Sequence, residues 1–467
     1  MLVDKKSTIT ILALLMFSVS SQALTIKEAV KNILQTNPSV QERVKNYNAT
    51  TQDIEIAKSG WLPTLDYVGT FGHEEYSGVG YSGKGYDMYD HSLVLVENLF
   101  NGLGTTYLMK IQQTRAAAAA YNYIEKANDV SFRLVEYYIN VLRDKELLNI
   151  AKENVKITEA IEKKVQKLYS SGLTQKSELK KVKASLALAN ANYFVRKNNM
   201  EDAVYQLKYF YGKKINVDEL VQPKFDFPIG SYQEGLDFAI DHNPSIIVQR
   251  YNIKVAQNKR HEAESGYYPK IDLQLTKSWR SNVNDIAGNS QYYSAVVKIR
   301  YNLFRGFEDK KKIEQGLSLI NKEIFTKNDL IRKTTEGYDL SWNAYTEIKN
   351  QLKYLEEYKK HSIDTLTLYS KEFDLGRRSL LDLLTAQNDL INAKYQIVNA
   401  KYDHLFSKYR ILDAMGTMVT SILGTSDPVY SKVGFIKRDN LQKDKYPKKQ
   451  ILKNDKFLET LEKNNNK

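Results

Sequence analysis

An internal repeat constrains the fold of this chain more than any other feature of its sequence. Short segments of the first half recur, in the same order, about 205 residues later in the second half. The matched segments are Asn37–Val40 with Asn243–Ile246, Ser59–Leu65 with Ser265–Ile271, and Asn98–Gly102 with Asn302–Gly306. One match of this length can arise by chance, whereas several in register indicate duplication. We therefore predict two copies of one structural unit, at residues 24–228 and 229–424.

Each copy passes through the same series of hydrophobic periods, which predicts a mixed α and β fold with the order helix, β-hairpin, long helix, helix. Apolar and polar residues alternate through Ile271–Trp279 and again through Ala295–Leu303, the period of a strand with one apolar face. We expect hairpins at about 62–100 and about 269–304. Their polar faces carry charges, which suits a water-filled barrel, although a half-buried soluble hairpin shows the same alternation. Two hairpins are too few to close a barrel, so a barrel would need several chains.

The stretches that follow the hairpins, at about 102–170 and about 306–374, contain no proline and are helical in pattern. At 1.5 Å per residue each would be roughly 100 Å long. A turn containing Gly172 or Gly376 leads from each into a returning helix with a seven-residue hydrophobic repeat. In the second copy the large and small positions are Leu383, Leu390 and Ile397 with Ala386, Ala393 and Ala400. This pattern predicts helices that wind closely around one another.

The two ends of the chain differ in composition from the repeats. Residues 1–23 have lysines, then an apolar run and a small-residue cleavage site, which predicts a secretory signal peptide. Residues 425–467 are polar and basic, and we expect a mobile tail. Residues 432–467 alone contain 11 Lys or Arg and 5 acids, so much of the formal charge of +13 lies in this tail. For an exported chain this charge does not indicate nucleic-acid binding, and without cysteine no disulfide can form.

The sequence offers no catalytic site, cofactor site or metal site. Residues 78–83 match the dinucleotide pattern G-x-G-x-x-G, but they lie between two expected strands and no helix follows to receive a phosphate. The six histidines lack metal-ligand spacing, and no nucleophile elbow or phosphate-binding loop is present. We therefore expect a protein that is not an enzyme and that uses no cofactor or metal.

The duplicated hairpins and long helices resemble the TolC family of outer-membrane efflux and type I secretion proteins, over residues 24 to about 424. The most specific motif is Phe373-x-x-Gly376 followed by Arg377–Leu384, with a partner at Ser171–Leu179. The resemblance implies a homotrimer with a twelve-stranded β-barrel in outer-membrane lipid and an α-helical barrel in the periplasm. It also implies a tripartite export system with a periplasmic adaptor and an inner-membrane ABC exporter or proton-driven pump.

By the same resemblance, the two turns form the periplasmic constriction of the duct. Asp382 would belong to an acidic ring that narrows the pore. Arg378 would hold the inner helices closed through contacts with Ser177 and Glu178, in a network that includes Phe373. Opening would untwist these helices.

The sequence shows two departures from the family pattern and leaves three alternatives open. Thr385 stands at the second acidic position, and Glu178 stands where some members have Asp, so cation selectivity would be weaker. Arg378 and Glu178 could equally form an ordinary exposed ion pair. The cargo is either a secreted polypeptide or small molecules, with a slight preference for secretion. The rival from another class is a non-conducting coiled-coil interaction protein of the periplasm or cell surface.

Overall fold

The computed structural model describes residues 24–75, 85–223, 230–283 and 286–423. The predicted signal peptide, the basic tail and the glycine-rich segment 78–83 lie outside the described residues. Contacts divide the chain into two units. Unit 1 takes its residues from 1–32, 134–227 and 349–403, and unit 2 from 33–133, 228–348 and 404–467.

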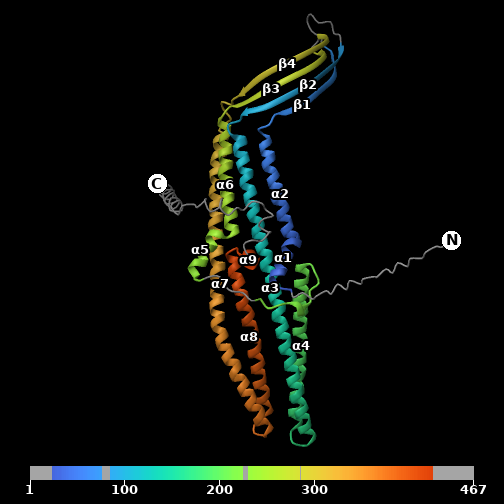
Figure 1. The fold of residues 1–467 in the computed structure, drawn as a ribbon, viewed down its shortest axis with the longest axis vertical. Coiled ribbons are helices and arrows are strands. Elements are labelled where there is room, and N and C mark those ends of the chain that lie inside the picture. Colours follow the sequence, from blue (N-terminus) through green and yellow to red (C-terminus); the bar gives the residue numbers. More distant parts are fainter. Residues whose placement is uncertain (1–23, 76–84, 224–229, 284–285, 424–467) are drawn as a thin grey trace, which may run out of the picture. The chain divides into compact units, whose positions relative to one another are not determined.

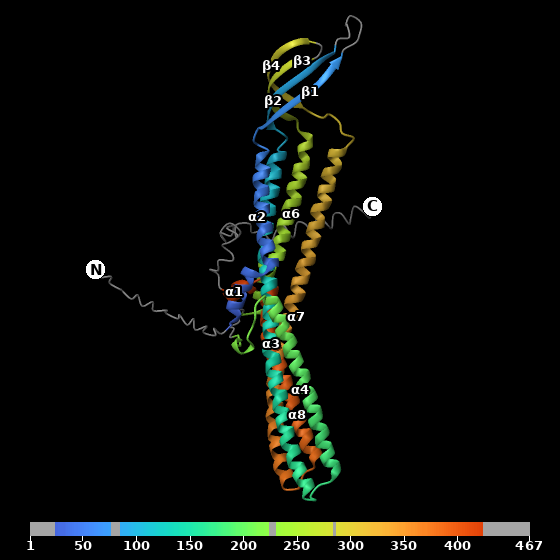
Figure 2. The same cartoon turned by 90° about the vertical axis from the view of Figure 1, so that its right-hand side faces the viewer.

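Apart from the short η1, η2 and α9, the elements follow one another in the same order in both halves of the chain (Figures 1 and 2). The first half contains α1 Ile26–Thr36, α2 Pro38–Ser59, β1 Thr64–Glu75, β2 Gly85–Phe100, α3 Gly104–Ser170, α4 Lys176–Tyr211 and the short η1 Val217–Glu219. The second half contains α5 Tyr232–His242, α6 Pro244–Ala263, η2 Glu264–Tyr267, β3 Lys270–Val283, β4 Ile286–Arg300, α7 Glu308–Asp374, α8 Leu380–Ala414 and α9 Met418–Leu423. The predicted mixed α and β class is confirmed. Among the described residues, none of the helices is long and apolar enough to cross a membrane.

The repeated Asn-Pro segments begin helices α2 and α6. Asn37 caps α2 by accepting the N–H of Ser39 at 2.9 Å, and Pro38 occupies the first turn, where its missing N–H costs nothing. Asn243 does the same for α6, accepting the Ser245 N–H at 2.9 Å. The repeat at this point therefore preserves a helix start.

The four strands form one antiparallel sheet in the order β1-β2-β3-β4, within unit 2 (Figure 1). Their register places Leu65, Leu95, Leu275 and Ala295 side by side in one row. Between the register shifts, odd-numbered residues share this face, which we call the apolar face, and even-numbered residues form the opposite polar face.

Two arginines of the polar face are paired with aspartates across strands. Asp272, which is buried, accepts from Asn98 at 3.1 Å and from Arg300 at 2.6 Å, linking β2, β3 and β4. Farther along the same face Arg280 pairs with Asp90 at 3.3 Å.

In unit 1, α8 packs against α3 along the seven-residue repeat. All six predicted seam positions from Leu383 to Ala400 are buried, and burying each of the large side chains contributes about 1.5–3 kcal/mol. Gln387 crosses the seam to Asn154 and Thr158, at 2.8 Å each. The matching seam of α4 is less complete, because Leu179 and Leu207 are buried whereas the large residues between them, Leu186, Tyr193 and Met200, are partly exposed.

Candidate functional site

Two turns in unit 1 carry the residues singled out by the sequence, one joining α3 to α4 and the other α7 to α8. Gly172 has φ +74° and Gly376 has φ +72°, a left-handed conformation that glycine adopts without steric cost. In the second turn the N–H of Arg377 donates to the carbonyl of Glu372 at 2.8 Å. The first turn repeats this bond, so both helices end in the same Schellman motif.

A small hydrophobic core lies beneath these turns. Its buried members are Val165, Leu179, Val182, Leu380 and Leu384, with Ile161 and Phe373 packed against them. Phe373 therefore acts as a packing residue, and the Lys164 ammonium lies 5.8 Å from the centre of its ring. Lys164 also pairs with Asp374, which ties α3 to the end of α7.

Asp382 stands at the start of α8, where it hydrogen-bonds with Ser379, the residue that precedes the helix. The Ser379 hydroxyl donates to an Asp382 carboxylate oxygen at 2.8 Å and accepts the Asp382 N–H at 3.2 Å. An acid in the first turn also suits the positive end of the helix dipole. The carboxylate is thus held in place by its own helix, and the residue keeps partial solvent exposure.

Arg378 binds within its own turn. Its Nε donates to the Glu372 carboxylate at 2.8 Å, and its guanidinium lies 4.1 Å from the centre of the Tyr369 ring. The hydrogen bond to Glu372 raises the pKa of Arg378, and the nearby Asp382 charge contributes in the same direction. Arg378 therefore stays charged and is held close to Asp382.

Ser177 and Glu178 lie at the start of α4 and have different surroundings. The Ser177 hydroxyl donates to the Gln175 side chain at 3.4 Å. The Oε2 atom of Glu178 is buried, and in the described chain it accepts no hydrogen bond. Among the described residues Arg378 forms no hydrogen bond or ion pair with either residue, so their predicted contact stays a prediction.

One face of α8 carries acids and amides without a cation. Its exposed side chains between Thr385 and Asn399 include Thr385, Asn388, Asp389, Asn392, Gln396 and Asn399; with Asp382 we call these residues the α8 polar stripe. Lys394, the one cation between Leu380 and Ala400, turns away to Glu153 of α3 at 2.7 Å. Lys401 likewise reaches Glu146 of α3 at 3.1 Å. The stripe therefore presents negative charge and neutral hydrogen-bonding groups to solvent.

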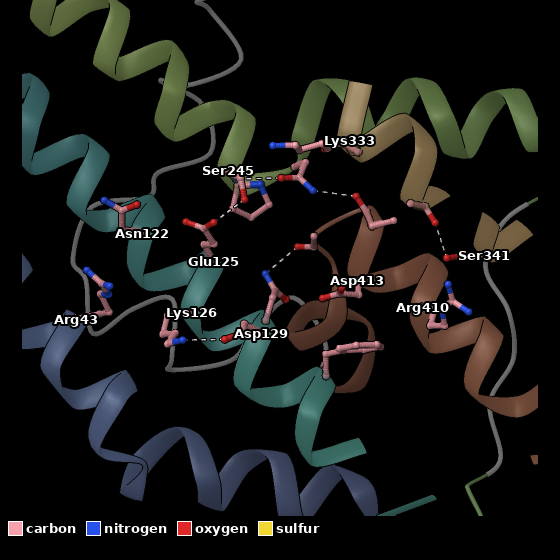
Figure 3. Close-up of a pocket in the computed structure, with 18 residues that line it drawn as sticks. Arg43, Asn122, Glu125, Lys126, Asp129, Ser245, Lys333, Ser341, Arg410 and Asp413 are labelled. Atoms are coloured by element: carbon pink, nitrogen blue, oxygen red, sulfur yellow. Dashed lines mark hydrogen bonds and ion pairs between the residues drawn. The ribbon is translucent and has the colours of Figure 1, made fainter. Parts of the chain in front are cut away.

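A polar cavity of about 610 Å³ lies in unit 2, between α2, α3, α6, α7 and α8 (Figure 3). Lys126 pairs there with Asp129 at 2.8 Å, and Ser245 donates to Glu125 at 2.6 Å. Asp413 of α8 also lines the cavity. Burial raises the pKa of Asp413 to about 7, and the Asp129 charge adds to the rise.

We expect the stability of unit 2 to fall as pH rises, because of Asp413. An unfolded aspartate has a pKa of about 3.9. The stability that protonated Asp413 contributes is therefore complete below that pH and is lost as pH rises through about 7. Since Asp413 keeps partial exposure, we expect a loss of roughly 2 kcal/mol per chain between pH 4 and pH 8. Unfolding in detergent at several pH values measures this.

The matched variants of that experiment are Asp413→Asn and Asp237→Asn. Asp413→Asn should flatten the pH dependence and be the more stable protein at pH 8. Asp237 is exposed on α5, so Asp237→Asn should leave the profile unchanged. If Asp413→Asn has the same dependence of stability on pH as wild type, Asp413 is not the group responsible for that dependence.

Comparison with protein families matches two segments of the chain to one model. The model for outer membrane efflux proteins matches residues 29–213 and 236–417. The chain belongs to the outer membrane efflux protein family. This membership confirms the resemblance drawn from the sequence and places the chain in the outer membrane, with an extension into the periplasm. The family consists of channels, not enzymes.

Individual relatives within the family are distant in sequence. Outer membrane protein TolC of Escherichia coli (strain K12) is 22% identical over 268 residues, which cover 55% of this chain and 52% of TolC. The match thus spans about half the length of that curated relative. The structure of the Campylobacter jejuni CmeC outer membrane channel has a TM-score of 0.75 at 16% identity, covering 88% of each chain. For Vibrio cholerae VceC the TM-score is 0.73 at 13% identity, covering 84% of this chain and 96% of VceC. At these identities the structures establish a shared fold.

Sequence reasoning missed several residues of the turns in this member of the family. The role of Ser379 at the start of α8 could have been predicted, because Ser-x-x-Asp before an apolar run is a capping signal. Glu372 and Tyr369, which hold Arg378, stand six and nine positions before it, across a turn whose path the sequence does not specify. Among the described residues, no three His, Asp or Glu side chains come together as a metal site requires.

Proposed function

We propose that three copies of this chain form a passive export duct through the outer membrane and periplasm. The α8 polar stripe is the observation that carries this proposal. Long helices that pack against one another usually bury apolar residues. The α8 polar stripe is instead polar over about five turns and contains no Lys or Arg. A water-filled pore that favours cations requires such a lining.

The sheet supports the trimer. In one chain β1 and β4 each have an unpaired edge, and such edges are normally covered or paired. β1 and β4 run in opposite directions along the sheet, so β4 of one copy can pair antiparallel with β1 of the next. Three sheets of four strands then close a twelve-stranded barrel without edges.

The two turns are the proposed constriction. Asp382 is the first acid of the α8 polar stripe, and Asp389, seven residues later, lies on the same helix face. Thr385 stands between them, so Asp389 takes the place of the missing second acid. Threefold symmetry would turn each of these residues into a ring of three carboxylates, which attracts cations and repels anions in a narrow mouth.

The proposed closing contact joins Arg378 to Ser177 and Glu178. The buried Glu178 oxygen supports it, because a buried carboxylate oxygen without a donor is costly and an arginine would satisfy it. Arg378 would exchange its present partner, Glu372, for Glu178 when neighbouring copies assemble. Release of this contact would let the inner helices untwist.

The proposed partners are those that the family resemblance implies. No energy source is evident in the sequence, and an inner-membrane ABC exporter or proton-driven pump would drive transport. A periplasmic adaptor would dock around 172–178 and 376–382. The cargo is a polypeptide secreted by a type I system, with small-molecule efflux as the second candidate.

Single-channel recording tests the proposal. The protein is extracted from outer membranes in detergent, its mass is measured, and currents are recorded in planar bilayers. We expect a trimer that forms small, cation-favouring channels. A chain that remains soluble without detergent and never conducts would instead support the coiled-coil interaction protein.

A further inference from the structure

One lysine of the sheet stands apart from every other cation in the four described strands. Lys270, Arg280, Lys298 and Arg300 all lie on the polar face, whereas Lys277 lies on the apolar face. Two of the polar-face cations pair with aspartates, as described above. Lys277 has no carboxylate partner among the described residues.

Aromatic rings surround the Lys277 ammonium. It lies 4.6 Å from the centre of the Trp279 ring and 5.1 Å from that of Tyr293, its cross-strand partner on β4. Cation–π contacts contribute about 0.5–2 kcal/mol, but they leave the three N–H donors of the ammonium without an acceptor. The Trp279 indole N–H also donates to nothing among the described residues. Two neighbouring groups on one face are thus hydrogen-bond donors without acceptors.

The position of Lys277 on the apolar face is at a boundary. Toward the helix-connected ends of the strands, this face presents mainly aliphatic side chains such as Leu275 and Ala295. From the row of Lys277 toward the hairpin ends, this face presents aromatic and polar side chains, including Tyr67, Phe71, Tyr89, His91 and Trp279, and beyond them the paired His73 and Asp87. In membrane barrels aromatic side chains gather at the level of the lipid headgroups. The cation therefore lies where the hydrocarbon region gives way to phosphates.

Family membership fixes which leaflet this is. The extension into the periplasm begins at the helix-connected ends of the strands, so the aromatic end of the apolar face lies toward the outer leaflet. A lysine facing hydrocarbon costs about 2–4 kcal/mol at the bilayer midplane and about 0–1 at the interface. A phosphate at the interface would accept hydrogen bonds from both Lys277 and Trp279 and would neutralise the charge.

We propose that Lys277 and Trp279 bind a phosphate group of the phosphorylated glycolipid of the outer leaflet, with Tyr293 packed beside the ammonium. This proposal requires that the apolar face of the sheet contacts lipid, but it does not require that the duct conducts. It would fix the depth of the barrel in the outer leaflet.

Native mass spectrometry of the full-length protein in detergent tests the site, with bisphosphorylated lipid A as the probe. Lys277→Gln should weaken binding about tenfold, since it removes a charge-assisted bond, whereas Lys277→Arg should retain it. Trp279→Phe keeps the ring and removes the N–H, so it should weaken binding by a factor of about three. Lys298→Gln, which removes the same charge from the polar face, is the matched control and should bind as wild type.

Three further arms identify the ligand. Dephosphorylated lipid A should bind as weakly to wild type as lipid A binds to Lys277→Gln, and phosphatidylglycerol should bind less tightly than lipid A. Inorganic phosphate should not displace the lipid. Equal binding by wild type and Lys277→Gln, equal losses in Lys277→Gln and Lys298→Gln, or displacement by inorganic phosphate would overturn the proposal. Channel recordings of Lys277→Gln should match wild type, so a failed lipid site is distinguishable from a failed duct.

Discussion

Asp382→Asn is expected to lower the preference of the channel for cations by several-fold in planar bilayers. The variant removes one charge per copy at the proposed constriction, where a narrow mouth amplifies the effect of fixed charge. Asparagine can still accept from the Ser379 hydroxyl, so the start of α8 should remain intact. Reversal potentials under a salt gradient measure the change.

The salt dependence and a second variant sharpen this test. The difference between wild type and Asp382→Asn should shrink in 1 M salt, where the Debye length is about 3 Å. Asp389→Asn alone should have a smaller effect, and the double variant should lose selectivity. Asp364→Asn, an exposed acid on α7, is the control and should behave as wild type. Unchanged selectivity in the double variant would mean that the α8 polar stripe does not line the pore.

Arg378→Ala is expected to raise single-channel conductance several-fold, by releasing the proposed closing contact. Glu178→Gln should produce a similar rise, because it removes the other partner of the same contact. The double variant should conduct no more than either single variant, since two residues that act through one contact are not additive. Conductance histograms of wild type, the two single variants and the double variant together make up this double-mutant cycle.

Glu372→Gln distinguishes the closing contact from the one within the turn. In the single chain Arg378 binds Glu372, so a lock made by that pair would open in Glu372→Gln. If Glu178 is the closing partner, loss of Glu372 frees Arg378 to bind it, and conductance should not rise. An open channel in Glu372→Gln together with a wild-type channel in Glu178→Gln would place the lock within the turn.

The local features of this fold could be predicted from the sequence. The cap residues Asn37 and Asn243, the turn glycines Gly172 and Gly376, and the seven-residue seam of α8 each depend on neighbours within a few positions. Helix caps, left-handed turns and hydrophobic periods are short-range effects, so they are readable in a single sequence. The family resemblance followed from their order.

The partners of charged side chains were decided by the tertiary structure. Arg378 lies beside Glu372, the α8 lysines turn to Glu153 and Glu146 of α3, and Asp413 is partly buried near Asp129. These pairings join residues across turns or across up to about 280 positions, and each depends on which helix faces meet.

Lys277 shows how the two kinds of information combine. By the two-residue period of a strand, its odd position places it on the same face as Leu275 and Trp279. The rings around it, and the absence of an acid among the described residues nearby, became known only once β4 was paired beside β3. Sequence periodicity determined which face each side chain occupies, whereas strand and helix packing determined its neighbours, because an ion pair or ring contact needs both groups within a few ångströms.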